Sequence, residues 1–277
     1  MANSYLSRTV SSDGNRKTMT FSFWLRRGAI KQGSNPCLIA DEQQSYPTHD
    51  ITFMSDDRLK VRSAVGTSDG SGGQLVAVTN KRFNDTTAWY HIVVAIDTTQ
   101  SANLDKLKIW SNGEQITSWS FAPECDQNLD TRFNTAQAIY IGKLNTQYSD
   151  MNLAHYHFVD GTALAPTVFG EFDSTSGIWK AKLDPGISTS QYGSNGFWLK
   201  FENGSALGAD SSGNGNNFAV SGNLRKSIST PSNKFARLNP RGTNRSYFTP
   251  NYQPYNGKSF LGSTGTTRCC MVDMCFA

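Results

Sequence analysis

The sequence contains few charged residues and no long apolar run. Charged side chains make up 17% of its 277 residues, against roughly 25% in an average globular protein. The longest aliphatic run, Ile92 to Ile96, is far shorter than the ~20 residues of a membrane-spanning helix, so the sequence predicts no membrane insertion. Arg8, Arg16 and Lys17 interrupt any apolar stretch near the first residue, which argues against a signal peptide and for synthesis in a cytoplasm.

Zinc-binding cysteine spacings are also missing. No Cys-x-x-Cys pair occurs among the five cysteines, and their spacing matches no zinc signature. A disulfide framework is not expected in a chain of this length that is made without a signal peptide. The sequence therefore predicts free thiols. A late or intermolecular bridge from the C-terminal cysteines Cys269, Cys270 and Cys275 is the alternative.

Residues that disfavour helix interiors are abundant. The chain contains 24 Gly and 9 Pro and is rich in Ser, Thr and Asn, which suit short strands and turns. Apolar and polar residues alternate with a period of two in residues 20–25 and 106–110, and Asn112-Gly113 is placed as a two-residue hairpin turn would be. At least nine such segments, with one helical turn near residues 166–170, predict an all-β antiparallel sandwich or barrel.

Positive charge is concentrated near the C-terminus. Residues 221–277 contain eight Lys and Arg and one acid, so they carry a net charge of +7, while residues 1–220 carry −3. The prolines of this segment disfavour a continuous sheet strand. The sequence predicts a sandwich domain at residues 1–222 and a basic, extended arm at residues 223–277. The candidate assembly residues of the arm are Arg225, Lys234, Arg237, Arg241, Arg245, Tyr247 and Tyr252.

Three interpretations of this arm are open. It could pack on an acidic neighbouring subunit, bind nucleic acid through phosphate charge, or stay solvated. Its aromatic residues argue against a purely solvated tail, and aromatic side chains together with Arg are typical of protein interfaces. A neighbouring subunit is therefore the expected partner, and no nucleic-acid partner is expected.

Five stretches resemble the strands of a known superfamily. Residues 20–27, 88–97 and 107–114 are similar to the early strands, and to the hairpin ending in Asn-Gly, of concanavalin A-like lectin/glucanase domains of the laminin G and pentraxin kind. Residues 138–142 and 153–161 resemble the later strands of these domains. The resemblance implies a two-sheet, antiparallel jelly-roll sandwich.

Further motifs are similar to virion-associated proteins of phages. They are residues 158–166, 169–173, 177–180, 195–199 and 210–218. The resemblance covers residues 4 to about 222. It implies a non-enzymatic protein of the virion surface, in a tail fibre or capsid fibre, with a lectin-like rim that faces a glycan or the host. Expected partners are other virion subunits, further copies of this chain and a host surface polysaccharide. A purely structural capsid decoration subunit and a degenerate glycoside hydrolase are the alternatives.

Carbohydrate sites combine an aromatic ring that stacks on a sugar with polar groups that hydrogen-bond its hydroxyls. Trp110, Trp119 and Tyr148 are the candidates, because they fall outside the clearest inward-facing rows of the predicted strands. Tyr46 and Trp179 are two further rings of this kind. The alternative is that these rings belong to the core, as most aromatic side chains of a sandwich do.

Retaining glycosidases need two carboxyl groups about 5–5.5 Å apart. Glu171 and Asp173 lie two residues apart and would share one face of a strand. The glucanases that the sequence resembles extend this pattern by a third carboxylate, but none follows here before Asp184. The sequence predicts no catalytic residue and expects the two acids to cap a turn.

Metal ligands are sparse. His155 and His157 would share a strand face, but a zinc site needs three or four ligands, so these histidines and His91 are expected to be partly buried and hydrogen-bonded. Calcium needs six to eight oxygens, and Asp210 is the one carboxylate of the loop at residues 210–217. The sequence predicts no cofactor and a tight turn at this loop, with a calcium ion at Asp210 as the alternative.

Overall fold

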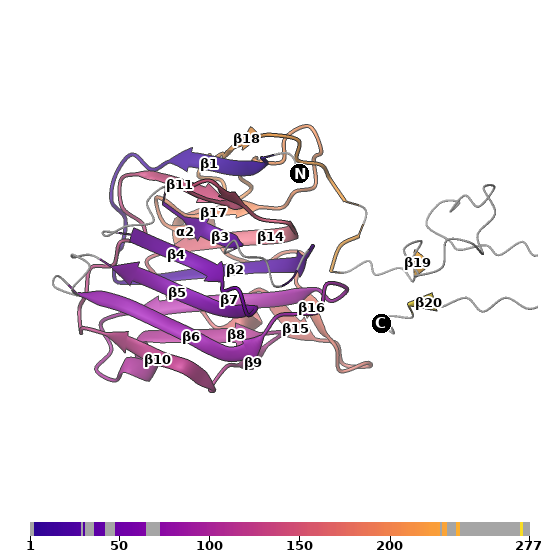
Figure 1. Ribbon diagram of the computed structural model, residues 1–277. Helices are drawn as coiled ribbons and strands as arrows, with labels where there is room; N and C mark the ends of the chain where they lie inside the picture. The colour runs from indigo at the N-terminus through magenta and orange to yellow at the C-terminus, as the bar shows by residue number, and fades with distance from the viewer. Residues whose placement is uncertain are drawn as a thin grey trace, which may run out of the picture.

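The computed structural model describes residues 3–28, 30, 36–41, 48–64, 73–227 and 229–231, and the backbone of residues 237–238 and 272–273. The fold is all-β, with 46% strand and 5% helix. Two antiparallel sheets pack face to face as a sandwich (Figure 1). This confirms the fold class expected from the alternating sequence segments and the Asn-Gly turns.

The first sheet has eight strands. In spatial order these are β10 (Trp119–Cys125), β6 (Gln74–Arg82), β5 (Arg58–Ala64), β4 (Thr48–Phe53), β3 (Cys37–Ala40), β11 (Ala138–Ile141), β1 (Tyr5–Thr9) and β18 (Ala219–Ser221). The first and last residues of the sandwich thus meet at one edge, where β18 pairs with β1. The last strand of the sandwich thus ends at Ser221, close to the predicted domain boundary.

The second sheet has six strands. In spatial order these are β17 (Phe197–Leu199), β14 (Met151–Asp160), β2 (Thr18–Arg27), β7 (Tyr90–Asp97), β8 (Leu107–Ser111) and β9 (Glu114–Gln115). Strand β7 lies between β2 and β8 and is buried from Tyr90 to Ile96. Its near-continuous apolar run is typical of a strand covered on both faces.

The remaining elements are short. They are α1 (Asn103–Lys106), β12 (Lys143–Leu144), β13 (Gln147–Tyr148), the 3-10 turn η1 (Pro166–Val168), β15 (Gly170–Phe172), β16 (Trp179–Ala181), α2 (Thr189–Tyr192), β19 (Arg237–Leu238) and β20 (Val272–Asp273). The helical turn predicted near residue 166 is confirmed. Helix α2 was not expected, although Ser188 and Gln191 form a capping box at its start.

Buried apolar side chains of the described residues form four clusters, and the smallest consists of Cys37, Ala40 and Leu144. The main core lies between the sheets, where alternate residues such as Phe21, Phe23 and Leu25 of β2 face inward. Two smaller clusters lie on the outer face of the six-stranded sheet and include Val159, Phe169 and Tyr192, and Trp24 and Trp179. The segment from residue 162 to 198 therefore covers the outer face, which explains why strands of this sheet carry apolar residues on both sides.

The Asn112-Gly113 turn is a two-residue hairpin, as predicted. Trp110 pairs with Gln115 and Ser111 with Glu114, and both turn residues have positive φ angles, 52° and 84°, as a type I′ turn requires. The second strand of the hairpin, β9, has two residues. It ends at Gln115, because the chain crosses to the eight-stranded sheet and starts β10 there.

The first part of the predicted arm lies on the sandwich. Leu224 packs against the main core, and Lys226 Nζ donates a hydrogen bond to the backbone oxygen of Glu202. Residues 223–227 and 229–231 are therefore part of the body, since Leu224 gains apolar burial there.

Among the described residues, no helix is long and apolar enough to cross a membrane.

Candidate functional site

The three predicted carbohydrate-binding rings lie in three different places. Trp110 is half-buried on the outer face of β8 and packs against the cluster of Val159 and Phe169. Trp119 begins β10 in the other sheet and packs against the main core. The ring of Tyr148, on β13, is 6.1 Å from the ring of Tyr5. The structure does not bring these rings together into one platform.

Of the two further aromatic residues, Trp179 contributes no exposed ring. Trp179 is 7% exposed, and its indole N–H donates a hydrogen bond to His91 Nδ1. Gly113 and Gly170 lie against its ring, and a Cβ atom at either glycine would come within 2.6 Å of it. Tyr46 lies outside the described residues.

Glu171 and Asp173 sit on an exposed hairpin and share one cation. Lys180 Nζ is 3.3 Å from Glu171 and 3.2 Å from Asp173. Asp173 Oδ1 also accepts hydrogen bonds from the backbone N–H groups of Thr175 and Ser176. The Ser176 N–H, followed by the Lys180 ammonium, holds the pKa of Asp173 below its ordinary value. An acid held in this way cannot supply a proton near neutral pH, and it closes a turn as the sequence predicted.

His91 is a buried, hydrogen-bonded histidine, as predicted. It is 1% exposed, and its Nε2 lies 2.9 Å from the Ser22 hydroxyl. Because Trp179 donates to Nδ1, the ring proton belongs on Nε2. Burial lowers the pKa of His91 to about 3, so the ring stays neutral and serves the packing of the outer face.

His155 and His157 both lie near one aromatic ring. The centre of the Trp198 ring is 6.5 Å from that of His155 and 4.9 Å from that of His157. Ala154 pairs with Trp24 but His157 pairs with Ser22, so β14 holds one extra residue and forms a bulge. His155 has a φ of 45° within this bulge. His157 is buried and lies 2.9 Å from the hydroxyl of Tyr192.

The carboxylate of Asp210 accepts four hydrogen bonds, three from its own loop and one from Trp198 of β17. Its Oδ1 accepts hydrogen bonds from the N–H groups of Trp198 and Ser212, and its Oδ2 accepts from the Ser212 hydroxyl and the N–H of Asn216. These four hydrogen bonds hold the loop in position. Within the described part of the chain, no three His, Cys, Asp or Glu side chains gather in a way that could hold a metal ion.

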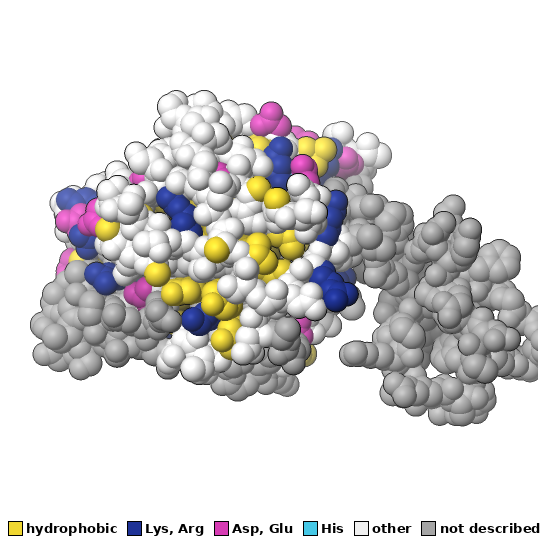
Figure 2. All heavy atoms as spheres, turned by 90° about the horizontal axis from the view of Figure 1, so that it is seen from above, with side chains coloured by type: hydrophobic (Ala, Val, Ile, Leu, Met, Phe, Trp, Pro, Cys, Tyr) yellow, Lys and Arg dark blue, Asp and Glu magenta, His cyan; other side chains and the backbone are white. Residues whose placement is uncertain are grey.

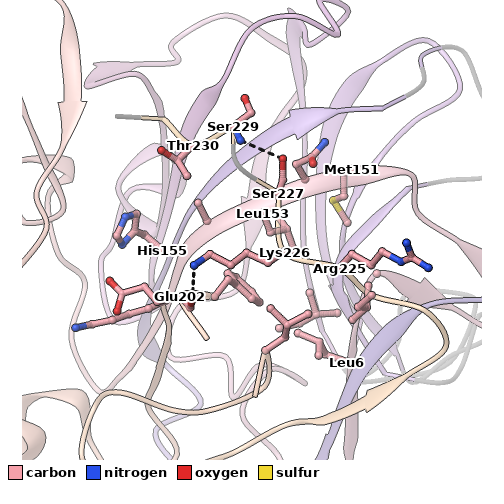
Figure 3. Close-up of a pocket in the computed structure, with 18 of the residues that line it drawn as sticks. Leu6, Met151, Leu153, His155, Glu202, Arg225, Lys226, Ser227, Ser229 and Thr230 are labelled. Atoms are coloured by element: carbon pink, nitrogen blue, oxygen red, sulfur yellow. Dashed lines mark hydrogen bonds between the residues drawn. The ribbon is translucent and has the colours of Figure 1, made fainter. Parts of the chain in front are cut away.

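A pocket with a volume of about 330 Å³ lies beside the β14 bulge. We call it the bulge pocket. Its walls come from the start of β1, from β14, from the chain after β17, and from residues 224–227 and 229–230 (Figure 3). Seen from above the β1–β18 edge, apolar side chains gather near the middle of the molecule, with Lys and Arg side chains around them (Figure 2).

Most of the lining of the bulge pocket is apolar, and we call this part its floor. It consists of three aromatic residues, Tyr5, Trp89 and Phe201, with Leu6, Ile141, Met151, Leu153, Leu207 and Leu224. Neutral hydrogen-bonding groups, among them Asn152, Ser227 and Ser229, lie on the wall. A pocket of this size, largely apolar with a few polar groups, is typical of a small-ligand site.

Two backbone irregularities shape this pocket. His155 in the bulge and Phe201 after β17 both have positive φ angles, 45° and 60°, which cost free energy in residues other than glycine. Both line the pocket. The Nδ1 atom of His155 is buried and has no hydrogen-bond partner among the described residues. Burial, opposed by the charge of Glu202, lowers the pKa of His155.

Sequence reasoning did not find this pocket. Of its lining residues, His155 was considered for zinc and Arg225 for the arm. The other lining residues come from segments that are far apart in the sequence, from Ser4 to Thr230, and meet only in the folded chain. Of the remaining arm residues, Arg237 is described only by its backbone. Lys234, Arg241, Arg245, Tyr247 and Tyr252 lie outside the described residues.

Several solved structures are similar to this chain at low sequence identity. No curated protein matches the chain. Among solved structures, a heptameric SAP-like pentraxin from Limulus polyphemus is similar at 12% identity, over 59% of this chain and 72% of that one, with a TM-score of 0.39. Domains LG4-5 of the mouse laminin alpha1 chain are similar at 12% identity, over 58% of this chain and 40% of that one, with a TM-score of 0.38.

A third similar structure is domain 4 of AbnA, a GH43 extracellular arabinanase from Geobacillus stearothermophilus, in complex with arabinotriose. The identity is 14%, over 56% of this chain and 67% of that one, and the TM-score is 0.37. The family model of the concanavalin A-like lectin/glucanases superfamily matches residues 2–162, more than half of the sequence. Together with the two-sheet antiparallel architecture, this match shows that the chain belongs to the concanavalin A-like lectin/glucanases superfamily.

Proposed function

We propose that this chain is a non-catalytic carbohydrate-binding protein of a phage particle, in which the bulge pocket holds a glycan and the basic C-terminal segment contacts other virion subunits. The bulge pocket is the observation that carries the proposal. Its apolar floor with the half-buried Phe201 suits the C–H face of a sugar ring, and Asn152 and the serines suit hydroxyl groups. Superfamily membership agrees with this function, because the superfamily comprises lectins and glucanases.

The state of the acids favours binding over hydrolysis. Glu171 and Asp173 are both paired with Lys180 on an exposed hairpin, and neither is among the residues that line the bulge pocket. A glycosidase needs its nucleophile and its acid on either side of one bound glycosidic bond. The proposed glycan and these carboxylates lie in different places.

The virion role is supported by the sequence motifs and by the charge of the C-terminal segment. Eight cations and one acid in residues 221–277 would repel one another in isolation and suit an acidic partner surface. A homo-oligomer and attachment to other virion subunits are the proposed assembly. The proposed glycan site is the same whether the chain belongs to a tail fibre or to a capsid fibre.

One observation favours the second candidate, a structural decoration subunit. The β15–β16 hairpin and the residues after it expose Phe172, Ile178 and Leu183, which are 55%, 42% and 67% exposed. Exposed apolar side chains that lie close together are typical of a contact surface. A decoration subunit would use this surface and would bind no glycan.

A glycan array separates these two functions. We expect the purified chain to bind a defined group of glycans. We also expect Phe201→Asn to weaken that binding about tenfold, because it removes the ring but tolerates the positive φ. Phe121→Asn is the matched control, since Phe121 is 44% exposed on β10 and lies outside the pocket. Glycan binding that is absent, or that both variants reduce equally, contradicts the bulge pocket as the site.

The absence of catalysis is tested with the glycans that bind. We expect no reducing sugar to be released on prolonged incubation, because Asp173 is held ionised and Glu171 shares its cation. The measurement is a reducing-end assay over a range of pH. Release of sugar that Glu171→Gln or Asp173→Asn abolishes would establish the degenerate glycoside hydrolase instead.

A further inference from the structure

We infer that the bulge pocket selects acidic glycans, in which a sugar carboxylate is bound by the cations on the pocket wall. The inference rests on the proposed function, since it names the class of glycan. Lys200, Arg225 and Lys226 line the pocket, and Glu202 is the one acid among the lining residues. The pocket therefore has an excess of positive charge next to its apolar floor.

The three cations are positioned by neutral groups. Lys226 Nζ donates a hydrogen bond of 2.6 Å to the backbone oxygen of Glu202. Arg225 Nε donates to the side chain of Asn223, and Lys200 Nζ lies 4.2 Å from the centre of the Trp198 ring. None of the three forms an ion pair with any residue that the structure describes.

Arg225 and Lys226 are exposed and Lys200 is half-buried, and their surroundings differ from those of the half-buried cations on β5. Lys60 and Arg62 on β5 both pair with the buried carboxylate of Asp50, at 2.9 and 2.6 Å. A cation held by a backbone oxygen or an aromatic ring keeps its full charge and remains available to an anion. The bulge pocket thus lacks the internal counter-ion that β5 has.

The cations lie at opposite ends of one hollow. In the close-up, Lys226 extends across the pocket toward Glu202, on the side of His155, whereas Arg225 points toward the other end (Figure 3). An extended ligand could therefore meet a cation at either end while its body covers Leu153 and the floor. Repeated acidic sugars in a polysaccharide present charges in this spaced manner.

The rest of the lining distinguishes an acidic sugar from other anions. A free phosphate would use the cations but leave the floor of Leu6, Leu153 and Phe201 uncovered. A fatty acid would cover this floor but leave Asn152 and Ser229 without hydrogen-bonding groups. A sugar acid supplies a carboxylate, hydroxyls and an apolar ring face together, so it matches all three kinds of lining group.

The test compares each acidic polysaccharide with its own neutral derivative. Polygalacturonate, alginate and hyaluronan are used beside their carboxyl-reduced forms, and binding of the full chain is followed by affinity electrophoresis and calorimetry. We expect binding to at least one acidic form, a loss of at least tenfold on carboxyl reduction, and weakening with salt. Equal binding to both forms, or binding to neutral glycans alone, overturns the acidic selectivity but leaves the proposed function intact. Failure to bind any glycan in this panel or on the array overturns both.

Charge variants assign the selectivity to this pocket. Lys226→Gln and Arg225→Gln together are expected to lower the affinity for the acidic form about tenfold and to leave the affinity for the reduced form unchanged. Lys81→Gln is the matched control, because Lys81 is exposed on β6 and also lies over an aromatic ring, that of Phe83. If the double variant keeps the preference for the acidic form, the inference is wrong.

Discussion

Lowering the pH from 6.5 to 5 is expected to reduce the free energy of unfolding by about 5 kcal/mol, because three histidines are buried in the neutral form. His49, His91 and His157 are 1%, 1% and 2% exposed. Burial lowers the pKa of His49 and of His91 to about 3, and it lowers the pKa of His157 well below its usual value. For His49, the charge of Asp50 opposes this effect but is the smaller cause.

The direction of the effect follows from proton uptake. Below pH 6.5 the unfolded chain protonates these rings while the folded chain does not, so acid favours unfolding. Each histidine contributes about 1.6 kcal/mol between pH 6.5 and 5 when its folded pKa lies far below this range. The loss continues until the pH reaches the folded pKa of about 3. The lowered pKa of Asp97 acts only below about pH 4, where the unfolded carboxylate titrates.

Urea unfolding at several pH values between 5 and 6.5 measures this effect. The matched variant is His157→Asn, which removes one titrating ring and should reduce the pH dependence by about a third, whatever its stability at pH 7. Stability that does not change across this range would show that the three rings are protonated in the folded chain. If the free energy of unfolding of His157→Asn depends on pH as steeply as that of the original chain, His157 does not contribute to the effect.

Local sequence patterns predicted the strands because they depend on neighbours along the chain. Alternation in residues 20–25 places Phe21 and Phe23 in the core, and Asn112-Gly113 adopts the positive φ angles that a tight hairpin needs. Both features are decided within a few residues. The same holds for Pro166, which begins the 3-10 turn where the sequence placed it.

Tertiary arrangement decided what the sequence did not predict. Trp110 does face away from the main core, as its register indicated, but the segment from residue 162 to 198 packs over that face and half-buries the ring. A single extra residue in β14 shifts its pairing with β2 between Ala154 and His157, and period-two reasoning cannot detect such a bulge. The bulge pocket is lined by residues from Ser4 to Thr230, which only the folded chain brings together.

A buried ion pair joins the two sheets. Arg27 ends β2 in the six-stranded sheet, and Asp57 lies in the turn between β4 and β5 of the other sheet. Both are 1% exposed, and Arg27 NH2 is 3.1 Å from Asp57 Oδ1. Arg27 also donates to the backbone oxygen of Phe83 and lies 4.3 Å from the ring centre of Phe53. The guanidinium therefore depends on Asp57 for its charge balance.

Asp57→Asn is expected to lower the free energy of unfolding by about 3–5 kcal/mol, because it leaves the charge of Arg27 buried without a counter-ion. Asn has nearly the same shape and tolerates the φ of 68° at this position, so backbone strain does not explain the loss. The neighbouring Asp56→Asn is the matched control. Asp56 pairs with Arg58 nearer the surface, and its loss should cost less than about 1 kcal/mol.

A double-mutant cycle separates the ion pair from packing. Arg27→Met combined with Asp57→Asn removes both charges, so the double variant should be more stable than the sum of the two single losses predicts, by at least about 1 kcal/mol. The measurement is urea unfolding of the four chains under one set of conditions. Additive losses would mean that the two side chains stabilise the sandwich independently, and a cost for Asp57→Asn no larger than that for Asp56→Asn would rule out a charge pair between the sheets. A coupling of the expected size would show that this pair fixes how the turn after β4 packs on the end of β2.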